Sequence, residues 1–186
     1  MAMLLEGIRV VDWTQWHAGP YGSALLADLG AEVIHVEHPT MPDSLRGMER
    51  TFGASMQLPQ GRHLIFELVN RNKKGIALDL SRPEGREVMY RLVAKSDVFV
   101  TNFRGAEKLG MDYQTLRQHN PRLVYALGSG LGDRGPDRGK PSLELCAYAR
   151  SGAMLGAGEP GWPPVYLPAC FADLMTGIFL AYGVIA

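Results

Sequence analysis

Residues 7–37 read GIRVVDWTQWHAGPYGSALLADLGAEVIHVE, and this stretch predicts the fold. A β-branched run lies at each end, over residues 7–12 and 31–37. Between them, residues 21–29 carry apolar side chains at helical spacing, and Gly30 is typical of the position just after a helix. A strand, a helix and a second strand in this order predict a βαβ unit with parallel strands and a right-handed crossover.

The same alternation continues along the chain. Strands are predicted over residues 75–80, 97–102 and 123–127, and helices over about 82–95 and over 112–119. Ser81 is a candidate cap for the first of these helices. Residues 38–70 are interrupted by Pro and Gly and are predicted to be irregular. We therefore expect an α/β fold with an open, mostly parallel, Rossmann-like sheet.

Composition excludes several classes of protein. Lys and Arg number 19 and Asp and Glu number 19, so the basic excess that nucleic-acid or anionic membrane surfaces require is absent. The two cysteines, Cys146 and Cys170, lie far apart, as in a reduced protein without a disulfide framework. The longest apolar stretch, residues 178–186, has about half the length of a membrane span. We expect a soluble, cytoplasmic protein with no nucleic-acid or membrane partner.

The last part of the chain is unusually apolar. From Asp173 it reads DLMTGIFLAYGVIA, with no further charged residue. A helix that is apolar on all sides has to be buried. We therefore expect a folding unit larger than this chain, completed by further sequence, a second copy or a complementary chain.

Three familiar site patterns are not favoured. Gly130, Gly132 and Gly135 match a dinucleotide-binding pattern, but Pro136 follows at once, where that pattern needs a helix. Ser129 lacks the surroundings of a hydrolase nucleophile, because Leu127 stands where glycine is needed. His35, Glu37 and His38 are close enough in the sequence to suggest a metal site, but strand alternation turns His38 away from the other two.

Asp173 has two interpretations from the residues alone. It precedes the terminal apolar helix, so it can be an N-cap residue. A carboxylate at a helix N-terminus is also stabilised in its charged form, and an ionised carboxylate needs no base to act as a nucleophile. The spacing does not choose between the two.

Several segments together resemble the class III coenzyme A transferases, the family of carnitine-CoA and formyl-CoA transferases. They occur in family order over nearly the whole chain. The segments are LEGIRVVD (5–12), HAGP (17–20), LADLGAEVIHVE (26–37), NRNKKGIALD (70–79), NFR (102–104), NPRLVY (120–125), GDRGP (132–136) and ADLMTG (172–177).

The resemblance implies an architecture. Family members have a Rossmann-like large domain and a small domain, with two subunits threaded through each other. Residues 1–186 are similar to the N-terminal part of the CoA-binding large domain only, so the small domain and the rest of the large domain are expected elsewhere. The partners implied are an acyl-CoA, a small carboxylic acid, and either an interlocked second copy or a complementary chain.

The resemblance also implies chemistry. Asp173 matches the carboxylate that attacks the acyl-CoA thioester to give an acyl-aspartyl anhydride. CoA thiolate then forms an aspartyl-CoA thioester, and the acceptor acid enters through a second anhydride. Coenzyme A is here a substrate, and no permanently bound cofactor or metal is implied. The positions implied for CoA are His17 and Ala18 beside the thioester, His38 near adenine, and Leu78, Asp79, Leu80, Ser81, Asn102, Phe103, Arg104 and Lys108 along the nucleotide and pantetheine.

Some positions depart from the family pattern. Many transferases have Gln where His17 stands, and the Pro that usually follows Asn-Phe-Arg is absent at Gly105. Related 2-methylacyl-CoA racemases have a His-Asp pair at the positions of Leu143 and Glu144, and a two-base proton transfer needs that His. The racemase is therefore an alternative that the sequence disfavours. A non-catalytic CoA-binding or assembly subunit is the other alternative.

Overall fold

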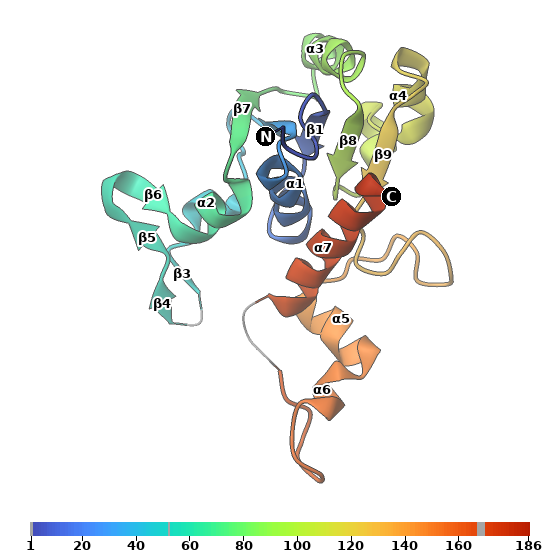
Figure 1. Ribbon diagram of the computed structural model, residues 1–186. Coiled ribbons are helices and arrows are strands. Elements are labelled where there is room, and N and C mark those ends of the chain that lie inside the picture. The colour runs from blue at the N-terminus through green and yellow to red at the C-terminus, as the bar shows by residue number, and fades with distance from the viewer. Residues whose placement is uncertain (1, 52, 167–169) are drawn as a thin grey trace.

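The computed structural model describes residues 2–51, 53–166 and 170–186 of the chain. Its main sheet has five parallel strands in the order β7-β2-β1-β8-β9 (Figure 1). The chain winds outward from β1 to β2 and β7, then returns to the other side of β1 for β8 and β9. The direction of winding therefore reverses between β1 and β8, which we call the switch point. This sheet confirms the predicted fold class. The strands are β1 (Arg9–Trp13), β2 (Glu32–Glu37), β7 (Lys73–Ala77), β8 (Val98–Thr101) and β9 (Val124–Leu127).

Helices and short elements connect these strands. Two small hairpins pair β3 (Arg50–Thr51) with β4 (Ala54–Ser55) and β5 (Gln57–Leu58) with β6 (Arg62–His63). Short 3₁₀ turns are η1 (Ser44–Gly47), η2 (Pro59–Gly61) and η3 (Ala106–Leu109). The α-helices are α1 (Ala18–Asp28), α2 (Leu64–Asn70), α3 (Pro83–Val93), α4 (Tyr113–His119), α5 (Glu144–Ser151), α6 (Ala153–Gly156) and α7 (Phe171–Ile185).

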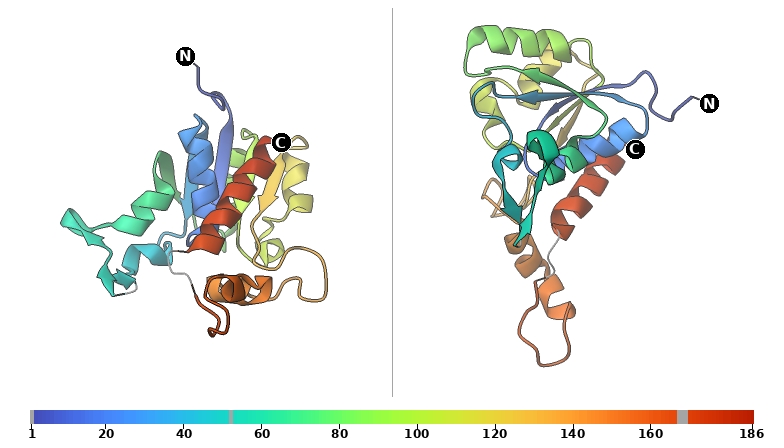
Figure 2. Two further views of the ribbon diagram at one scale, coloured as in Figure 1. Left: turned by 60° about the horizontal axis from the view of Figure 1, so that its bottom comes forward. Right: turned by 90° about the vertical axis from the view of Figure 1, so that its left-hand side faces the viewer.

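The sheet is the middle of three layers. Helices α1 and α7 cover one face, and α3 and α4 cover the other (Figure 2). Successive residues of β1 point to opposite faces. Val10 therefore packs with Leu26 of α1, whereas Val11 packs with Met89 of α3, and both valines are fully buried. Each face of the sheet has its own hydrophobic core.

Several element boundaries differ from the prediction. Helix α1 begins at Ala18 rather than at residue 21, because Pro20 is tolerated in the first turn, where its missing N–H needs no partner. Strand β7 ends at Ala77 rather than at residue 80, because the chain turns at Asp79, whose C=O accepts from the N–H of Arg82 (3.2 Å). Ser81 as a helix cap is wrong: the N-cap of α3 is Arg82, and the Ser81 hydroxyl donates to Asp79 (2.6 Å).

Residues 38–70 are more ordered than predicted. They hold both small hairpins and helix α2. Each hairpin strand has two residues, which is too short to show an alternating hydrophobic pattern in the sequence. Helices α5 and α6, which were also not predicted, form a segment that extends away from the sheet (Figures 1 and 2).

Helix α7 is only partly buried within this chain. Gly177 and Ala181 face α1 and are buried, but Phe179 and Tyr182 on the opposite side are 65% and 68% exposed. A groove between α7 and β9 is lined by apolar residues that include Phe179, Leu180 and Val124. The expected burial of all sides of α7 is thus not achieved by the described residues. None of the helices in the described part of the chain has the length and apolar character needed to cross a membrane.

Candidate active site

The loop between β1 and α1, which ends at His17, is fixed by the strand across the switch point. The N–H of Gln15 donates to Oδ1 of Asn102 (3.0 Å), and Nδ2 of Asn102 donates to the C=O of Gln15 (2.7 Å). Asn102 directly follows β8, so a single side chain joins the carboxyl ends of β1 and β8. Ligands of open α/β sheets bind at this point of the fold.

The backbone at Trp16 takes an uncommon conformation. Its φ of +65° lies in the left-handed region, which non-glycine residues seldom adopt. The N–H of Trp16 donates to Oδ2 of Asp43 (3.0 Å), a residue of the segment after β2. Asn102, which follows β8, and Asp43, which follows β2, therefore hold this loop from the two sides of β1. Together they set the direction in which the chain enters α1 at His17.

A buried charge network lies beneath this loop. Asp12 is fully buried near the carboxyl end of β1 and accepts from the hydroxyls of Thr14 and Ser23 and from Nζ of Lys73 (2.8 Å). Lys73 also donates to the C=O of Pro20 in the first turn of α1 (2.8 Å). The network thus attaches both ends of the loop to the sheet.

Two glycines bring the amino ends of α1 and α7 together. A Cβ added at Gly177 of α7 would lie 2.9 Å from the C=O of Ala18, and one added at Gly22 of α1 would lie 2.9 Å from the C=O of Gly177. The helix backbones therefore touch at a distance that a side chain would prevent. Because of this close approach, His17 at the start of α1 lies beside Asp173 in the first turn of α7, with Nδ1 and Oδ2 4.0 Å apart.

Asp173 is not the N-cap of α7, so that interpretation is wrong. The helix begins earlier, and its N-cap is Cys170, whose thiol lies 3.7 Å from Nε2 of His17. The capping acceptor comes from another helix: the carboxylate of Glu144 in α5 accepts from the N–H of Ala172 (3.2 Å) and of Asp173 (2.9 Å). The Asp173 side chain is therefore left to face His17.

The electrostatics of the site also differ from the prediction. Burial and, to a smaller extent, the charge of Glu144 together raise the pKa of Asp173 to about 6. The expected stabilisation of the charged form by the helix terminus is thus wrong in sign, because burial and the charge of Glu144 outweigh it and Glu144 occupies two of the amides that would provide it. Burial lowers the pKa of His17, so the imidazole is neutral at pH 7. Burial and the two carboxylates raise the pKa of Cys170 to about 11.

His17, Cys170 and Asp173 are also a candidate metal group. One ligand atom from each residue lies within 4.8 Å of the others. However, Nε2 of His17 faces Cys170 while Nδ1 faces Asp173, and one imidazole gives an ion only one of its nitrogens. The arrangement therefore suits a hydrogen-bond donor beside a carboxylate better than a preformed metal site.

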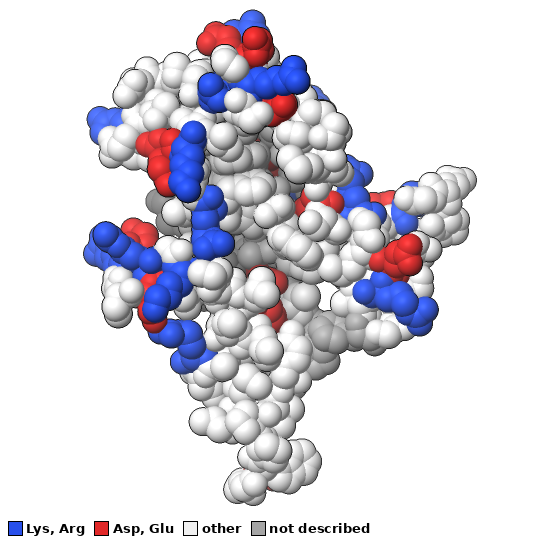
Figure 3. Space-filling model, turned by 180° about the vertical axis from the view of Figure 1, so that it is seen from behind, with Lys and Arg blue, Asp and Glu red and all other residues white. Residues whose placement is uncertain are grey.

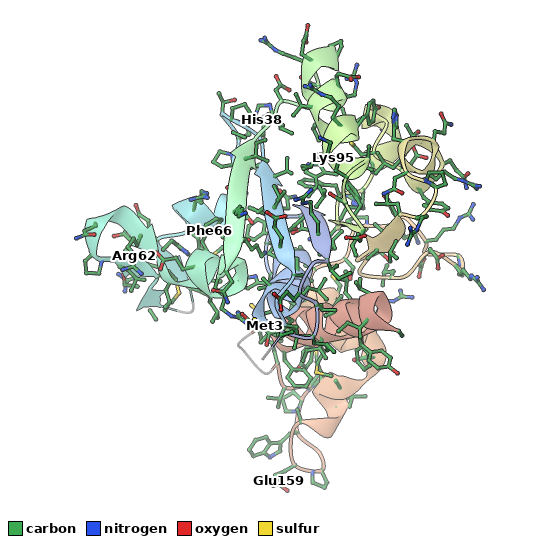
Figure 4. All side chains as sticks on the ribbon, turned by 45° about the horizontal axis from the view of Figure 1, so that its top comes forward. Met3, His38, Arg62, Phe66, Lys95 and Glu159 are labelled. Atoms are coloured by element: carbon green, nitrogen blue, oxygen red, sulfur yellow. The ribbon has the colours of Figure 1, made fainter. Side chains whose placement is uncertain are left out.

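A second set of predicted residues lies where β2 and β7 end. Nε2 of His38 is 3.3 Å from Oδ1 of Asp79, which also accepts from the N–H of Ser81 (3.0 Å). The N–H of Leu78 donates to the C=O of Glu37 (2.9 Å), and Leu80 is buried. Figure 4 shows His38 at this end of the sheet, well separated from Glu159. His38, Leu78, Asp79, Leu80 and Ser81 therefore form one local group.

The remaining predicted residues follow β8. Phe103 stacks on Trp13 of β1, with ring centroids 4.4 Å apart. Arg104 donates to the C=O of Gly139 (3.4 Å), and Lys108 lies in η3. Because all these strands are parallel, this group, the His38 group and the His17 loop all follow carboxyl ends of the sheet. Figure 3, which shows the molecule from behind, has Lys and Arg side chains interspersed with Asp and Glu over its upper part, whereas the tapered end that holds α5 and α6 is mostly uncharged.

Two residues of the site escaped the sequence analysis. The sequence relates Glu144 only to a racemase residue and Cys170 only to the redox state of the protein. Helix α5 and helix α7 meet only in the tertiary structure, so no spacing rule connects Glu144 with Asp173. A signal was nevertheless present, because Glu144 is an acidic residue in a stretch otherwise poor in charge.

Comparison with known proteins fixes the family. The sequence profile described as CoA-transferase family III matches residues 5–186. The chain belongs to this family. It is 37% identical over 99% of its length to (R)-2-hydroxy-4-methylpentanoate CoA-transferase of Clostridioides difficile and 38% identical over its whole length to formyl-CoA:oxalate CoA-transferase of Streptomyces avermitilis.

Solved structures agree with this assignment. A CAIB/BAIF family protein from Brucella suis superposes on all of the chain with a TM-score of 0.90 at 34% identity. The chain covers 49% of that protein, 46% of the C. difficile enzyme and 44% of the S. avermitilis enzyme. This family III chain thus spans about half the length of the relatives that it matches.

Proposed function

We propose that this family III chain supplies the nucleophile and much of the CoA site of an enzyme that moves CoA from an acyl-CoA to a carboxylic acid. The observation that carries the proposal is the pair formed by Asp173 and His17 at the switch point of the sheet. In this pair a partly buried carboxylate lies 4.0 Å from a neutral imidazole. The family membership and the names of the relatives support the same reaction class.

The chemistry follows from the carboxylate. An Oδ of ionised Asp173 attacks the thioester carbonyl, and the C–S bond breaks to give an acyl-aspartyl anhydride and CoA thiolate. The thiolate then attacks the aspartyl carbonyl, which releases the donor acid and leaves an aspartyl-CoA thioester. The acceptor carboxylate attacks this thioester, releases the thiolate and forms a second anhydride. Attack of the thiolate on the acceptor's acyl carbonyl gives the new acyl-CoA and restores Asp173.

The neutral state of His17 suits a donor role in this sequence. A neutral imidazole carries one N–H, which can donate to the oxygen that becomes negative when Asp173 attacks. Gln, which many family members have at this position, also carries an N–H donor. The side chain of residue 17 is therefore proposed to stabilise the developing charge without exchanging a proton.

The remaining residues of the proposed CoA site lie along the carboxyl ends of the strands. Ala18 begins α1 directly after His17, and Asn102, Phe103, Arg104 and Lys108 follow β8. Arg104 and Lys108 provide positive charge for phosphate groups. His38, Leu78, Asp79, Leu80 and Ser81 are proposed to contact the nucleotide end. No resident cofactor is needed, because CoA itself is the group transferred.

Residues 1–186 are proposed to be the N-terminal part of the CoA-binding large domain. The exposed side of α7 and the edge strand β9 leave an apolar surface, and the relatives are about twice as long as this chain. We propose that further sequence, a complementary chain or an interlocked second copy covers that surface. A second candidate function, a CoA-binding or assembly subunit without its own activity, is supported by the same difference in length.

Trapping the intermediate tests the proposed function. The active assembly that contains this chain is incubated with acyl-CoA and then with hydroxylamine, and the modified residue is located by mass spectrometry. We expect a hydroxamate at Asp173 and no turnover in Asp173→Ala. Normal turnover by Asp173→Ala would refute the nucleophile. CoA binding without any transfer, in every assembly that contains the chain, would favour the non-catalytic subunit.

A further inference from the structure

Glu144 connects two helices at the candidate active site. It is the first residue of α5, and its two carboxylate oxygens accept separately from the N–H groups of Ala172 and Asp173. Capping groups normally come from residues next to the helix that they cap. Here the acceptor lies 29 residues before Asp173 in the sequence.

These two hydrogen bonds change what Asp173 can do. The free amides of a first helical turn usually stabilise a nearby anion. Glu144 occupies two of them and brings its own negative charge to the same turn. The carboxylate of Asp173 therefore lies at a helix terminus without receiving the stabilisation that a helix terminus usually gives.

The other titratable groups around Asp173 do not offset the charge of Glu144. His17, from the loop before α1, is neutral at pH 7 because burial lowers its pKa. Cys170, at the start of α7, has its pKa raised to about 11 by burial and by the two carboxylates. Burial raises the pKa of Tyr166, in the segment before α7, and Glu144 and Asp173 add to this shift. Among the described residues, Glu144 is therefore the charged group that acts most directly on Asp173.

We propose that Glu144 is a positioning residue that fixes the first turn of α7 and withholds its amides from Asp173, so that the Asp173 carboxylate faces His17 as a strong nucleophile. This inference rests on the proposed function of Asp173. A carboxylate with a higher pKa is more basic and attacks a carbonyl more readily, provided that it is ionised at the working pH. A pKa of about 6 meets both conditions at neutral pH.

Replacement of Glu144 by Gln tests this role. Gln keeps the shape of the side chain and one acceptor oxygen, but it loses the charge and the second acceptor. The measurement is the pH dependence of kcat/KM for CoA release in the assembly that turns over acyl-CoA. We expect the acid limb of Glu144→Gln to move down by about one pH unit and the plateau to fall about tenfold or more.

Glu159→Gln is the matched control. Glu159 is exposed in the loop after α6, away from the site (Figure 4), and its removal is expected to leave the profile unchanged. A purely structural anchor would lower the plateau of Glu144→Gln without moving the acid limb, and that result would overturn the proposal. Full activity of Asp173→Ala would instead refute the proposed function, so the two failures are distinguishable.

A second variant keeps the test decisive if Glu144→Gln does not fold. Glu144→Asp retains the charge but shortens the side chain by one methylene, so it cannot reach both amides. We expect its acid limb to stay near that of the parent while its plateau falls several-fold. An unchanged plateau would show that the paired amide contacts do not position Asp173, and the proposal would fail.

Discussion

The amino group of Lys73 lies 2.8 Å from Oδ2 of Asp12, and the two side chains are 2% and 0% exposed. This ion pair connects the edge strand β7 with the central strand β1 across β2. Burial would by itself raise the pKa of Asp12, but Lys73 and His35 hold it well below its usual range. The pair supports the loop that ends at His17, because Lys73 also binds the C=O of Pro20.

Loss of this pair is expected to destabilise the fold strongly. Lys73→Met leaves the Asp12 carboxylate buried without its counter-ion, and we expect a loss of about 3–5 kcal/mol in the free energy of unfolding. Lys74→Met is the neighbouring control, because Lys74 is 72% exposed and solvent screens its ion pair with Glu32, so we expect little change in stability. Urea unfolding followed by circular dichroism measures both, and equal losses would contradict the assigned role of Lys73.

The close contact between α1 and α7 is expected to depend on the absence of a side chain at Gly177. Gly177→Ala places a Cβ against backbone atoms of α1, so the helices must separate and His17 moves away from Asp173. We expect a loss of about 1–3 kcal/mol in stability and a fall of roughly a hundredfold in kcat/KM. Gly183→Ala in the same helix meets open space, and we expect it to leave both quantities unchanged or to stabilise the helix slightly. Unimpaired activity in Gly177→Ala would refute the close-approach argument.

The charge on Asp173 is expected to cost stability. Its pKa is higher in the folded state than in the unfolded chain, so folding binds its proton more tightly and stability falls as the pH rises from about 4 to 6. Asp173→Asn removes this cost, and we expect it to be more stable than the parent by about 1–2 kcal/mol at pH 7.5. The difference should vanish below pH 4, where the parent is protonated in both states. Unfolding free energies at the two pH values measure the effect, and an Asn variant less stable at pH 7.5 would contradict it.

Residue 17 is expected to act as a neutral donor. His17→Gln keeps an N–H donor, so we expect activity within a few-fold of the parent, with the same acid limb near pH 6 that Asp173 sets. His17→Ala loses the donor, and we expect kcat/KM to fall about 10²–10³-fold. The pH profile of kcat/KM for the three proteins provides the measurement. An acid limb that disappears in His17→Gln would show that the limb belongs to His17 rather than to Asp173.

The apolar side of α7 is expected to drive association. Phe179 and Tyr182 are more than half exposed in this chain, and burial of each large apolar side chain contributes about 1.5–3 kcal/mol. We therefore expect the 186-residue chain to associate at micromolar concentration in analytical ultracentrifugation. Phe179→Glu should weaken that association. A sharp monomer that unfolds cooperatively and binds no hydrophobic dye would refute this expectation.

The sequence by itself determined the sheet and its connections. The β-branched runs, the helical spacing over residues 21–29 and the position of Gly30 are local properties, and they predict the βαβ unit that the structure confirms. The order of the family's segments likewise placed Asp173, His17 and the residues after each strand in one predicted site. Two-residue hairpin strands in the segment 38–70 left no periodic signal and were therefore missed.

The tertiary structure alone decided the chemistry around Asp173. The neighbours of Asp173 in the sequence allow two interpretations, an N-cap residue or a nucleophile, and both place an ionised carboxylate at a helix N-terminus that stabilises its charge. The cap comes instead from Glu144 on another helix, and burial together with the charge of Glu144 raises the pKa to about 6. Hydrogen bonds between distant segments and the exclusion of water depend on how helices pack, and local patterns do not encode that packing. The proximity of His17 and Asp173 also depends on helix packing. Gly22 of α1 and Gly177 of α7 have to face each other before the two helices can approach so closely.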